Sequence, residues 1–140
     1  AGGAFLNALG AGGVLRPGTP AAGATFTVVG YGAFGSMAND IQPGDGQRRV
    51  ASSGFMFLQP RWLFLNQNAA LGNGGTAEGD SGGPVYWVDP GSGEATLVSL
   101  TSRGDAVGVA TGTTDRVDTA EALDFVRDVI ERVGAGEFDE

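Results

Sequence analysis

The chain has 140 residues, enough for one domain, and its 16 acidic and eight basic side chains give a net charge of −8. All eight basic residues are arginines scattered along the chain, which argues against nucleic acid and anionic membranes as partners. The absence of Cys, His and Lys excludes disulfides, thiolate nucleophiles, transition-metal sites built on Cys or His, and a Ser-His or Ser-Lys pair made within these residues.

The 26 glycines and the 41% hydrophobic content predict short strands joined by many turns. Residues 1–24 are rich in Gly and Ala and are interrupted by Pro17 and Pro20, so we expect an irregular lead-in or interdomain linker. No membrane-spanning run and no signal peptide are recognisable in the sequence. Residues 25–134 are predicted to form the folded domain, and residues 135–140 an acidic tail.

Six runs rich in β-branched and aromatic residues predict six strands. Turn residues separate them at Pro43–Gly46, at Pro60 and at Asp89–Gly93, and a glycine-dense loop spans Leu71–Gly83. The predicted strands are Thr25–Tyr31, Arg48–Gln59, Trp62–Asn66, Pro84–Val88, Ala95–Ser102 and Val107–Val117.

One amphipathic helix is predicted at the C-terminal end of the domain. Asp118 and Glu121 are expected to form a capping box, and Gly134 to end the helix. Its apolar stripe should pack on the sheet, and it consists of Ala122, Leu123, Phe125, Val126, Val129, Ile130 and Val133. The large residues expected in the core or in helix packing are Phe55, Met56, Phe57, Leu58, Trp62, Leu63, Phe64, Trp87 and Phe125.

The segment with the strongest chemical signal is Gly79-Asp80-Ser81-Gly82-Gly83-Pro84. A serine hydroxyl becomes a useful acyl-transfer nucleophile when it protrudes from a tight turn whose backbone N–H groups converge on a developing oxyanion. Glycines permit both the tight turn and the close approach. Ser81 is therefore the candidate nucleophile, and the amides of Gly79 and Ser81 are the candidate oxyanion hole. The alternative is a flexible loop, because Gly, Asp and Ser are common turn residues.

On this hexapeptide the sequence resembles the trypsin/chymotrypsin-like serine peptidases, in particular the bacterial secreted members. The resemblance extends to Thr25–Gly32, to Gly72–Glu78, to Leu97–Gly104, and to Gly112–Asp118 with the following helix. It covers only the second half of the family fold. It implies an all-β domain, a six-stranded antiparallel Greek-key barrel with a C-terminal α-helix.

The resemblance also implies roles for individual residues. Ser81 would be the nucleophile, Gly79 and Ser81 the oxyanion hole, and Asp80 the support of the oxyanion loop. A protein or peptide substrate would bind in a pocket, with no cofactor and no metal, and the protein would be extracellular. The pocket would be lined by Gly75, Thr76, Glu78, Ser102, Arg103, Gly104 and Gly112.

Two departures from the family pattern bear on activity. Because the chain has no His, the base and its orienting Asp would have to come from a missing N-terminal β-barrel, in the same precursor or a separate chain. The chain by itself is therefore expected to be inactive. Gly75 stands where relatives that cleave after Arg or Lys carry Asp, so that specificity is not expected. A second hypothesis is a catalytically inactive binding or structural module on the same half-fold.

Three further patterns have plainer explanations. Gly30-x-Gly32-x-x-Gly35 matches a dinucleotide fingerprint but leaves no room for the crossover helix before Pro43. Arg103-Gly104-Asp105 spells an adhesion tripeptide, which we interpret as cleft wall. The carboxylates near the helix could suggest a cation site, although a helix cap and a solvated face explain them better: Asp115, Asp118, Glu121, Asp124 and Asp128.

Overall fold

The computed structural model describes residues 24–35, 40–88, 91–105 and 110–136. Residues 1–23 of the predicted lead-in and residues 137–140 of the predicted tail lie outside this range. In chain order the elements are β1 (Thr25–Gly30), β2 (Phe34–Gly35), β3 (Ile41–Gln42), β4 (Arg49–Leu58), β5 (Trp62–Asn66), the 3-10 helix η1 (Ala69–Leu71), β6 (Pro84–Val88), β7 (Ala95–Gly104), β8 (Thr111–Arg116) and α2 (Ala120–Gly134).

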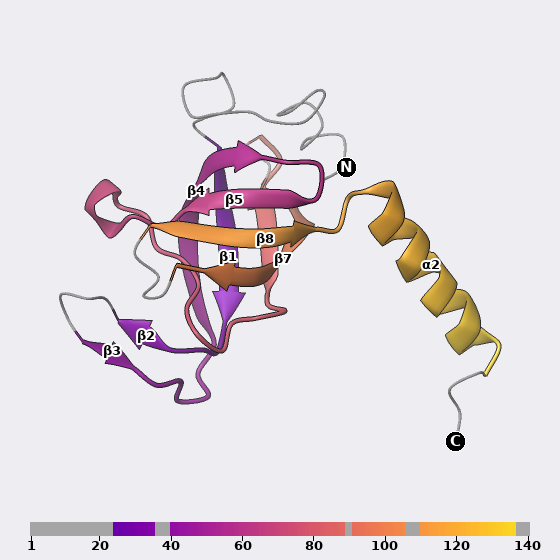
Figure 1. Cartoon of the computed structure of the whole chain (residues 1–140), viewed down its shortest axis with the longest axis horizontal. Coiled ribbons are helices and arrows are strands. Elements are labelled where there is room, and N and C mark those ends of the chain that lie inside the picture. The colour runs from indigo at the N-terminus through magenta and orange to yellow at the C-terminus, as the bar shows by residue number, and fades with distance from the viewer. Residues whose placement is uncertain (1–23, 36–39, 89–90, 106–109, 137–140) are drawn as a thin grey trace.

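Six of the strands close into an antiparallel barrel (Figure 1), in the order β1-β4-β5-β8-β7-β6. β4 pairs with β1, and β5 pairs with β4. The next barrel strand in the chain, β6, does not continue beside β5 but pairs with the other edge of β1. This return is the Greek-key connection. The predicted fold class, a six-stranded antiparallel barrel followed by a C-terminal helix, is confirmed. The predicted sixth strand began at Val107, and residues 107–109 lie outside the described range.

The barrel core comes from the inward-facing positions of the strands. Phe26 and Val28 alternate along β1, and both are buried, as the period of two in a strand requires. Of the large residues expected inside, Phe55, Leu58 and Leu63 are buried, whereas Phe57 and Phe64 are half-buried and stack on each other with ring centroids 4.1 Å apart. The buried apolar core is Phe26, Val28, Phe55, Leu58, Leu63, Leu65, Val85 and Val98.

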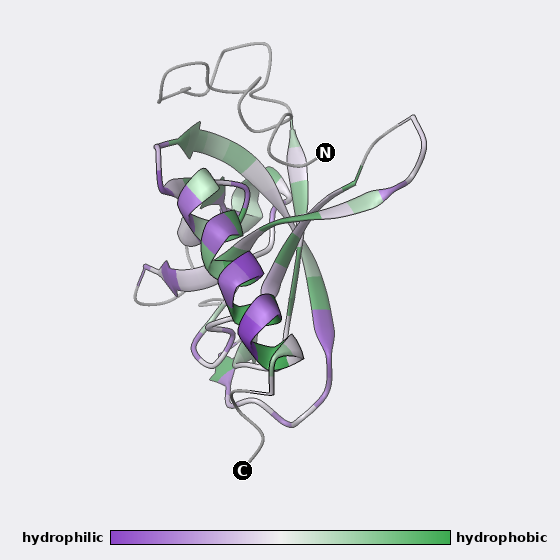
Figure 2. Cartoon of the chain, turned by 90° about the vertical axis from the view of Figure 1, so that its right-hand side faces the viewer, coloured by the Kyte–Doolittle hydropathy of each residue, from purple (hydrophilic) through white to green (hydrophobic). Residues whose placement is uncertain are grey.

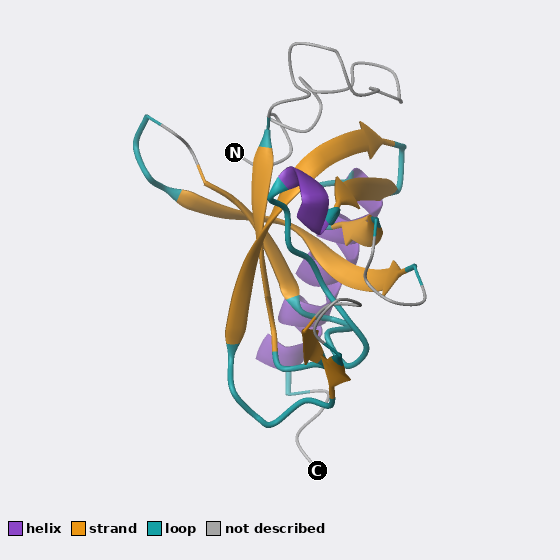
Figure 3. Cartoon of the chain, turned by 90° about the vertical axis from the view of Figure 1, so that its left-hand side faces the viewer, coloured by secondary structure: helices purple, strands orange, loops and turns teal. Residues whose placement is uncertain are grey.

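A small ribbon of β2 and β3 lies beside one end of the barrel and was not predicted (Figure 3). Each strand has only two residues, too few for any periodic signal. Phe34 of β2 lies under the guanidinium of Arg49, which is 3.7 Å from the ring centroid. A cation over an aromatic face is attracted to it, and this contact joins the ribbon to the start of β4.

The helix α2 is present, but two predictions about it are wrong. Its N-cap is Thr119, whose hydroxyl accepts a hydrogen bond from Ala122 N at 3.2 Å, and Asp118 instead forms a buried ion pair with Arg116 at 2.7 Å. Gly134 is the last helical residue, as expected.

The helix also does not pack on the sheet. It extends away from the barrel (Figure 1), and none of its residues is buried. Phe125 is 67% exposed and Ile130 is 64% exposed, and hydrophobic and hydrophilic residues alternate along the helix (Figure 2). Among the described residues, nothing covers the apolar stripe of the helix. No helix in this part of the chain is both long enough and apolar enough to cross a membrane.

Candidate active site at Ser81

Ser81 lies on a glycine turn in the loop that leads into β6. Gly79 has φ +93° and Gly82 has φ +81°, so both residues beside the Asp80-Ser81 pair occupy the left-handed region that favours glycine. The side chain of Ser81 is exposed. The turn therefore presents the hydroxyl to solvent.

The turn is held in place by backbone hydrogen bonds to β7. Gly82 N donates to Thr101 O at 2.8 Å, Thr101 N donates to Gly83 O at 2.9 Å, and Gly83 N donates to Asp80 O at 2.9 Å. Within the described residues, the amides of Gly79 and Ser81 donate no hydrogen bond. These are the two amides proposed for the oxyanion hole, and both are available to an incoming acceptor.

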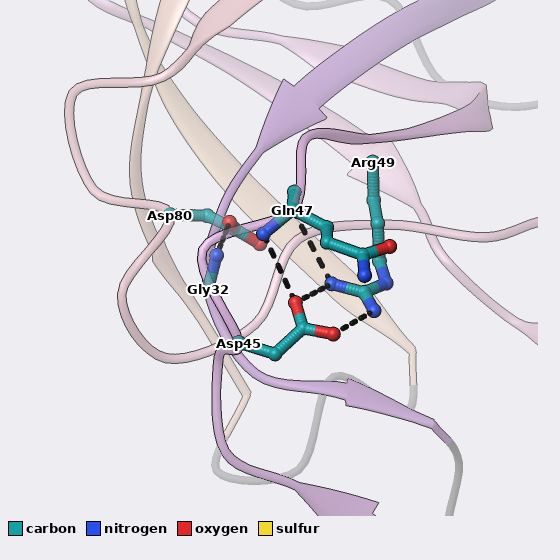
Figure 4. A network of polar contacts seen from close by, with 5 residues as sticks. All are labelled: Gly32, Asp45, Gln47, Arg49 and Asp80. Carbon is teal, nitrogen blue, oxygen red and sulfur yellow. Dashed lines mark hydrogen bonds and ion pairs between the residues drawn. The ribbon is translucent and has the colours of Figure 1, made fainter.

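The carboxylate of Asp80 is buried behind this turn. Oδ1 accepts a hydrogen bond from Gly32 N at 2.7 Å, and Oδ2 accepts one from Ala77 N at 2.8 Å. Ala33 N donates to Glu78 O at 2.8 Å alongside. Two backbone amides thus satisfy the buried carboxylate, as burial of a charged group requires. Asp80 anchors the loop before Ser81 to the segment after β1 (Figure 4).

This anchoring explains two of the glycines in the rejected dinucleotide fingerprint. A Cβ on Gly30 would meet the Asp80 carboxylate, and a Cβ on Gly32 would meet Glu78 O and lie 2.7 Å from Asp80 Oδ1. Only glycine allows the backbone to approach this closely. After Gly32 the chain enters β2, so the described residues carry no helix at the position the fingerprint requires.

A second polar network lies beside this anchor (Figure 4). The guanidinium of Arg49 donates to both carboxylate oxygens of Asp45, at 2.7 and 2.8 Å, and Gln47 N donates to Asp45 Oδ1 at 3.0 Å. Together these hydrogen bonds hold the pKa of Asp45 well below its ordinary value, and the bond from Arg49 has the largest effect. The network fixes the turn before β4.

A cleft of about 810 Å³ opens beside Ser81. Six of the predicted pocket residues line it: Gly75, Thr76, Glu78, Ser102, Arg103 and Gly104. A second hollow, of about 470 Å³, also borders Ser81 and includes Gly79. The structure therefore gathers the predicted nucleophile, oxyanion amides and most of the predicted pocket at one place.

Gln67 is a lining residue that sequence reasoning missed. Its side chain is 3% exposed and lies against Gly75 and Gly112, where a Cβ on either glycine would meet the carboxamide. Gly112 is therefore behind Gln67 and is not among the cleft-lining residues. A single Gln after a predicted strand has no periodic or motif signal, so nothing in the sequence indicated that it would be buried here.

The Arg103-Gly104-Asp105 tripeptide is built into the cleft wall. Gly104 pairs with Gly112 at the end of β7, and the carboxylate of Asp105 accepts hydrogen bonds from Ala110 N at 2.7 Å and Thr111 N at 2.9 Å. The guanidinium of Arg103 lies 5.5 Å from a ring centroid of Trp62. The three residues are exposed, and all of them line the cleft.

Four of the five carboxylates near the helix, all except Glu121, form ion pairs with arginines. The pairs are Asp115 with Arg61 at 2.9 Å, Asp118 with Arg116 at 2.7 Å, Asp124 with Arg127 at 2.9 Å, and Asp128 with Arg132 at 3.8 Å. Across the described ranges, no group of three or more His, Cys, Asp or Glu side chains is placed to hold a metal ion.

Comparison with known proteins assigns the chain to no family, because no family model matches it and no curated protein matches it significantly.

Proposed function

We propose that this chain is the nucleophile-bearing half of a trypsin-like serine endopeptidase. In this proposal Ser81 Oγ attacks the carbonyl carbon of a peptide bond, and an external base accepts its proton. The resulting oxyanion is bound by the amides of Gly79 and Ser81. Collapse of this intermediate releases the amine, which takes up the proton, and leaves an acyl-enzyme that water hydrolyses.

One observation carries the proposal. An exposed serine hydroxyl stands on a glycine turn next to two amides that donate to nothing in the described chain, above a buried carboxylate that fixes the loop. Exposed loop amides can also bond to water, so what supports the proposal is the combination: both amides flank the Ser81 turn, and the buried Asp80 carboxylate fixes that turn. The cleft beside Ser81 supplies space for a substrate side chain.

The base must come from outside these residues, since the sequence contains no His. The partner that we propose is an N-terminal β-barrel, in the same precursor or a separate chain, which supplies His and its orienting Asp. Without the base, the rate falls by roughly four to six orders of magnitude. The exposed apolar face of α2 supports a partner, because large exposed apolar surfaces on a domain mark interaction sites. Secretion is part of the proposal through the family resemblance.

A second candidate function is a catalytically inactive peptide-binding module. The missing His favours it, whereas the unbonded amides beside Ser81 favour the enzyme. If the enzyme proposal is right, a second barrel with His and a later Asp should be found in one of two places. It should be encoded upstream in the same coding sequence, or it should be present in a chain that co-purifies with this one.

Fluorophosphonate labelling of the complete native protein tests the proposal directly. We expect label on Ser81, found by peptide mass spectrometry, and none in Ser81→Ala. Ser92→Ala is the matched control, because Ser92 is an exposed serine in the turn after β6, whereas Ser81 precedes that strand, and it should label as the native protein does. Absence of label on Ser81 together with tight peptide binding would favour the inactive module. The 140-residue chain alone should show no measurable proteolysis.

A further inference from the structure

The carboxamide of Gln67 is buried and borders the cleft, and we call the part of the cleft beside it the base. It lies against Gly75 and Gly112, and an atom at the Cβ position of Gly104 would lie 3.8 Å from Gln67 Nε2. The same side chain lines the cleft that borders Ser81. Any substrate side chain that fills this cleft to its base therefore meets a neutral amide.

The Gln67 amide has hydrogen-bonding capacity that the described chain does not use. Oε1 has no hydrogen-bond partner, and Nε2 donates only to Thr76 Oγ1 at 3.5 Å, the limit of a hydrogen bond. Thr101 Oγ1, on the cleft-lining strand β7, is also buried without a partner. Buried polar atoms are normally bonded, and an unsatisfied one is costly, so these atoms call for a polar group supplied from outside.

The immediate surroundings of the Gln67 carboxamide favour a neutral group. The carboxylates of Glu78, Asp80 and Asp105 line the cleft, but among the described residues none of them is hydrogen-bonded to Gln67, whose side chain donates to Thr76. A cation buried against the Gln67 carboxamide would therefore have no counter-ion bonded there and would lose hydration without full compensation. A carboxylate would face the acceptor Oε1.

We propose that Gln67 is a specificity-determining residue and that the cleft takes a carboxamide side chain, asparagine or glutamine, of the substrate. The amide of such a side chain donates to Oε1 and accepts from Nε2, so both open positions of Gln67 are filled. If the oxygen and nitrogen of the Gln67 side chain are interchanged, a substrate carboxamide can still form the same two hydrogen bonds by turning over. The inference rests on the proposed function only in taking the ligand to be a peptide.

Peptide binding to the ¹⁵N-labelled chain tests this without requiring catalysis. The probes are N-acetyl-Ala-Ala-Xaa-N-methylamides with Xaa as Gln or its near-isostere Met, Asn or its near-isostere Leu, and Glu or Lys. We expect the better carboxamide peptide to bind about tenfold more tightly than its apolar isostere and than the charged peptides, since a site built for hydrogen bonds rejects analogues that lack them. The side-chain NH₂ resonance of Gln67 should shift on binding.

Variants separate recognition by Gln67 from general peptide affinity. Gln67→Met should abolish the preference, and the matched control Gln47→Met, at an exposed position outside the cleft, should retain it. If Gln67→Met does not fold, the Gln67 resonance of the native chain decides instead. Equal binding of each carboxamide and its isostere, tightest binding of Lys or Glu, or an unshifted Gln67 resonance would overturn the proposal. Failure of Ser81 to label while the preference holds would overturn the enzyme function alone.

Discussion

Gly32→Ala probes the contact that holds the loop before Ser81. The Cβ that this substitution adds would meet Glu78 O and would lie 2.7 Å from Asp80 Oδ1 and 2.8 Å from Asp80 N. Two of these three atoms are backbone, so no rotation of a flexible side chain relieves the contact. Either the loop stays and the crowding remains, or it moves and the hydrogen bond from Gly32 N to Asp80 lengthens or breaks.

The cost can be bounded from either outcome. Overpacking in a well-packed region costs about 1–3 kcal/mol, and losing a hydrogen bond to a charged group costs about 1.5–3 kcal/mol. Because relief of the first brings on the second, the two costs are alternatives and do not add. We expect the free energy of unfolding to fall by about 2–3 kcal/mol, a large part of the 5–15 kcal/mol that is typical of a small domain.

Urea unfolding followed by Trp fluorescence measures this change, with Trp62 and Trp87 as the reporters in the barrel. Gly134→Ala is the control, because a Cβ there meets nothing within 4 Å and the position is helical, so its stability should be unchanged or slightly higher. In the complete protein, Gly32→Ala should also slow fluorophosphonate labelling of Ser81. A variant with native stability and a native labelling rate would show that the Asp80 anchor does not position the nucleophile.

Three other predictions concern the ion pairs and the helix. Asp118→Ala removes the counter-ion of the buried Arg116 and should cost about 3–5 kcal/mol in urea unfolding, against about 1 kcal/mol for Thr119→Ala, the true N-cap; equal effects would contradict this assignment. Ile130→Glu should leave the stability of the chain in urea unfolding within about 0.5 kcal/mol, because the residue is exposed; a large loss of stability would show that α2 packs on the barrel. The Asp45 carboxylate should remain ionised as the pH falls through about 4, where an ordinary aspartate titrates, and its ion pair should be lost only at lower pH; NMR titration should show a higher Asp45 pKa in Arg49→Gln than in the native protein, and no difference between the two proteins would contradict the pairing.

The barrel strands were predictable from the sequence because they carry local signals, whereas the closed barrel was expected through the family resemblance. Thr25-Phe26-Thr27-Val28 is β-branched and aromatic and alternates between exposed or half-buried and buried positions, and Trp62–Asn66 was bounded by Pro60 on one side. The apolar stripe of α2 was equally predictable from the sequence, but its exposure to solvent was not. Periodicity indicates that one face is apolar, but it does not indicate what covers that face.

The candidate site divides in the same way. Ser81 and its flanking glycines are consecutive in the sequence, so the tight turn and its chemistry could be inferred from local backbone requirements. Gln67 and Gly32 could not be inferred. Each acts through residues 8 to 48 positions away, Gln67 through Gly75 and Gly32 through Asp80, and neither type of residue has a pattern that identifies such a contact.

By itself the sequence determined the six barrel strands, the terminal helix and the glycine turn at Ser81, because propensity, period and turn chemistry act over a few neighbouring residues. Only the tertiary structure decided that Asp80 is held by Gly32, that Asp118 pairs with Arg116, and that Gln67 lies at the base of the cleft. Closing the barrel brings these distant residues together. Their partners are selected by which buried charges and polar atoms must be satisfied there, and that requirement exists only once the chain is folded.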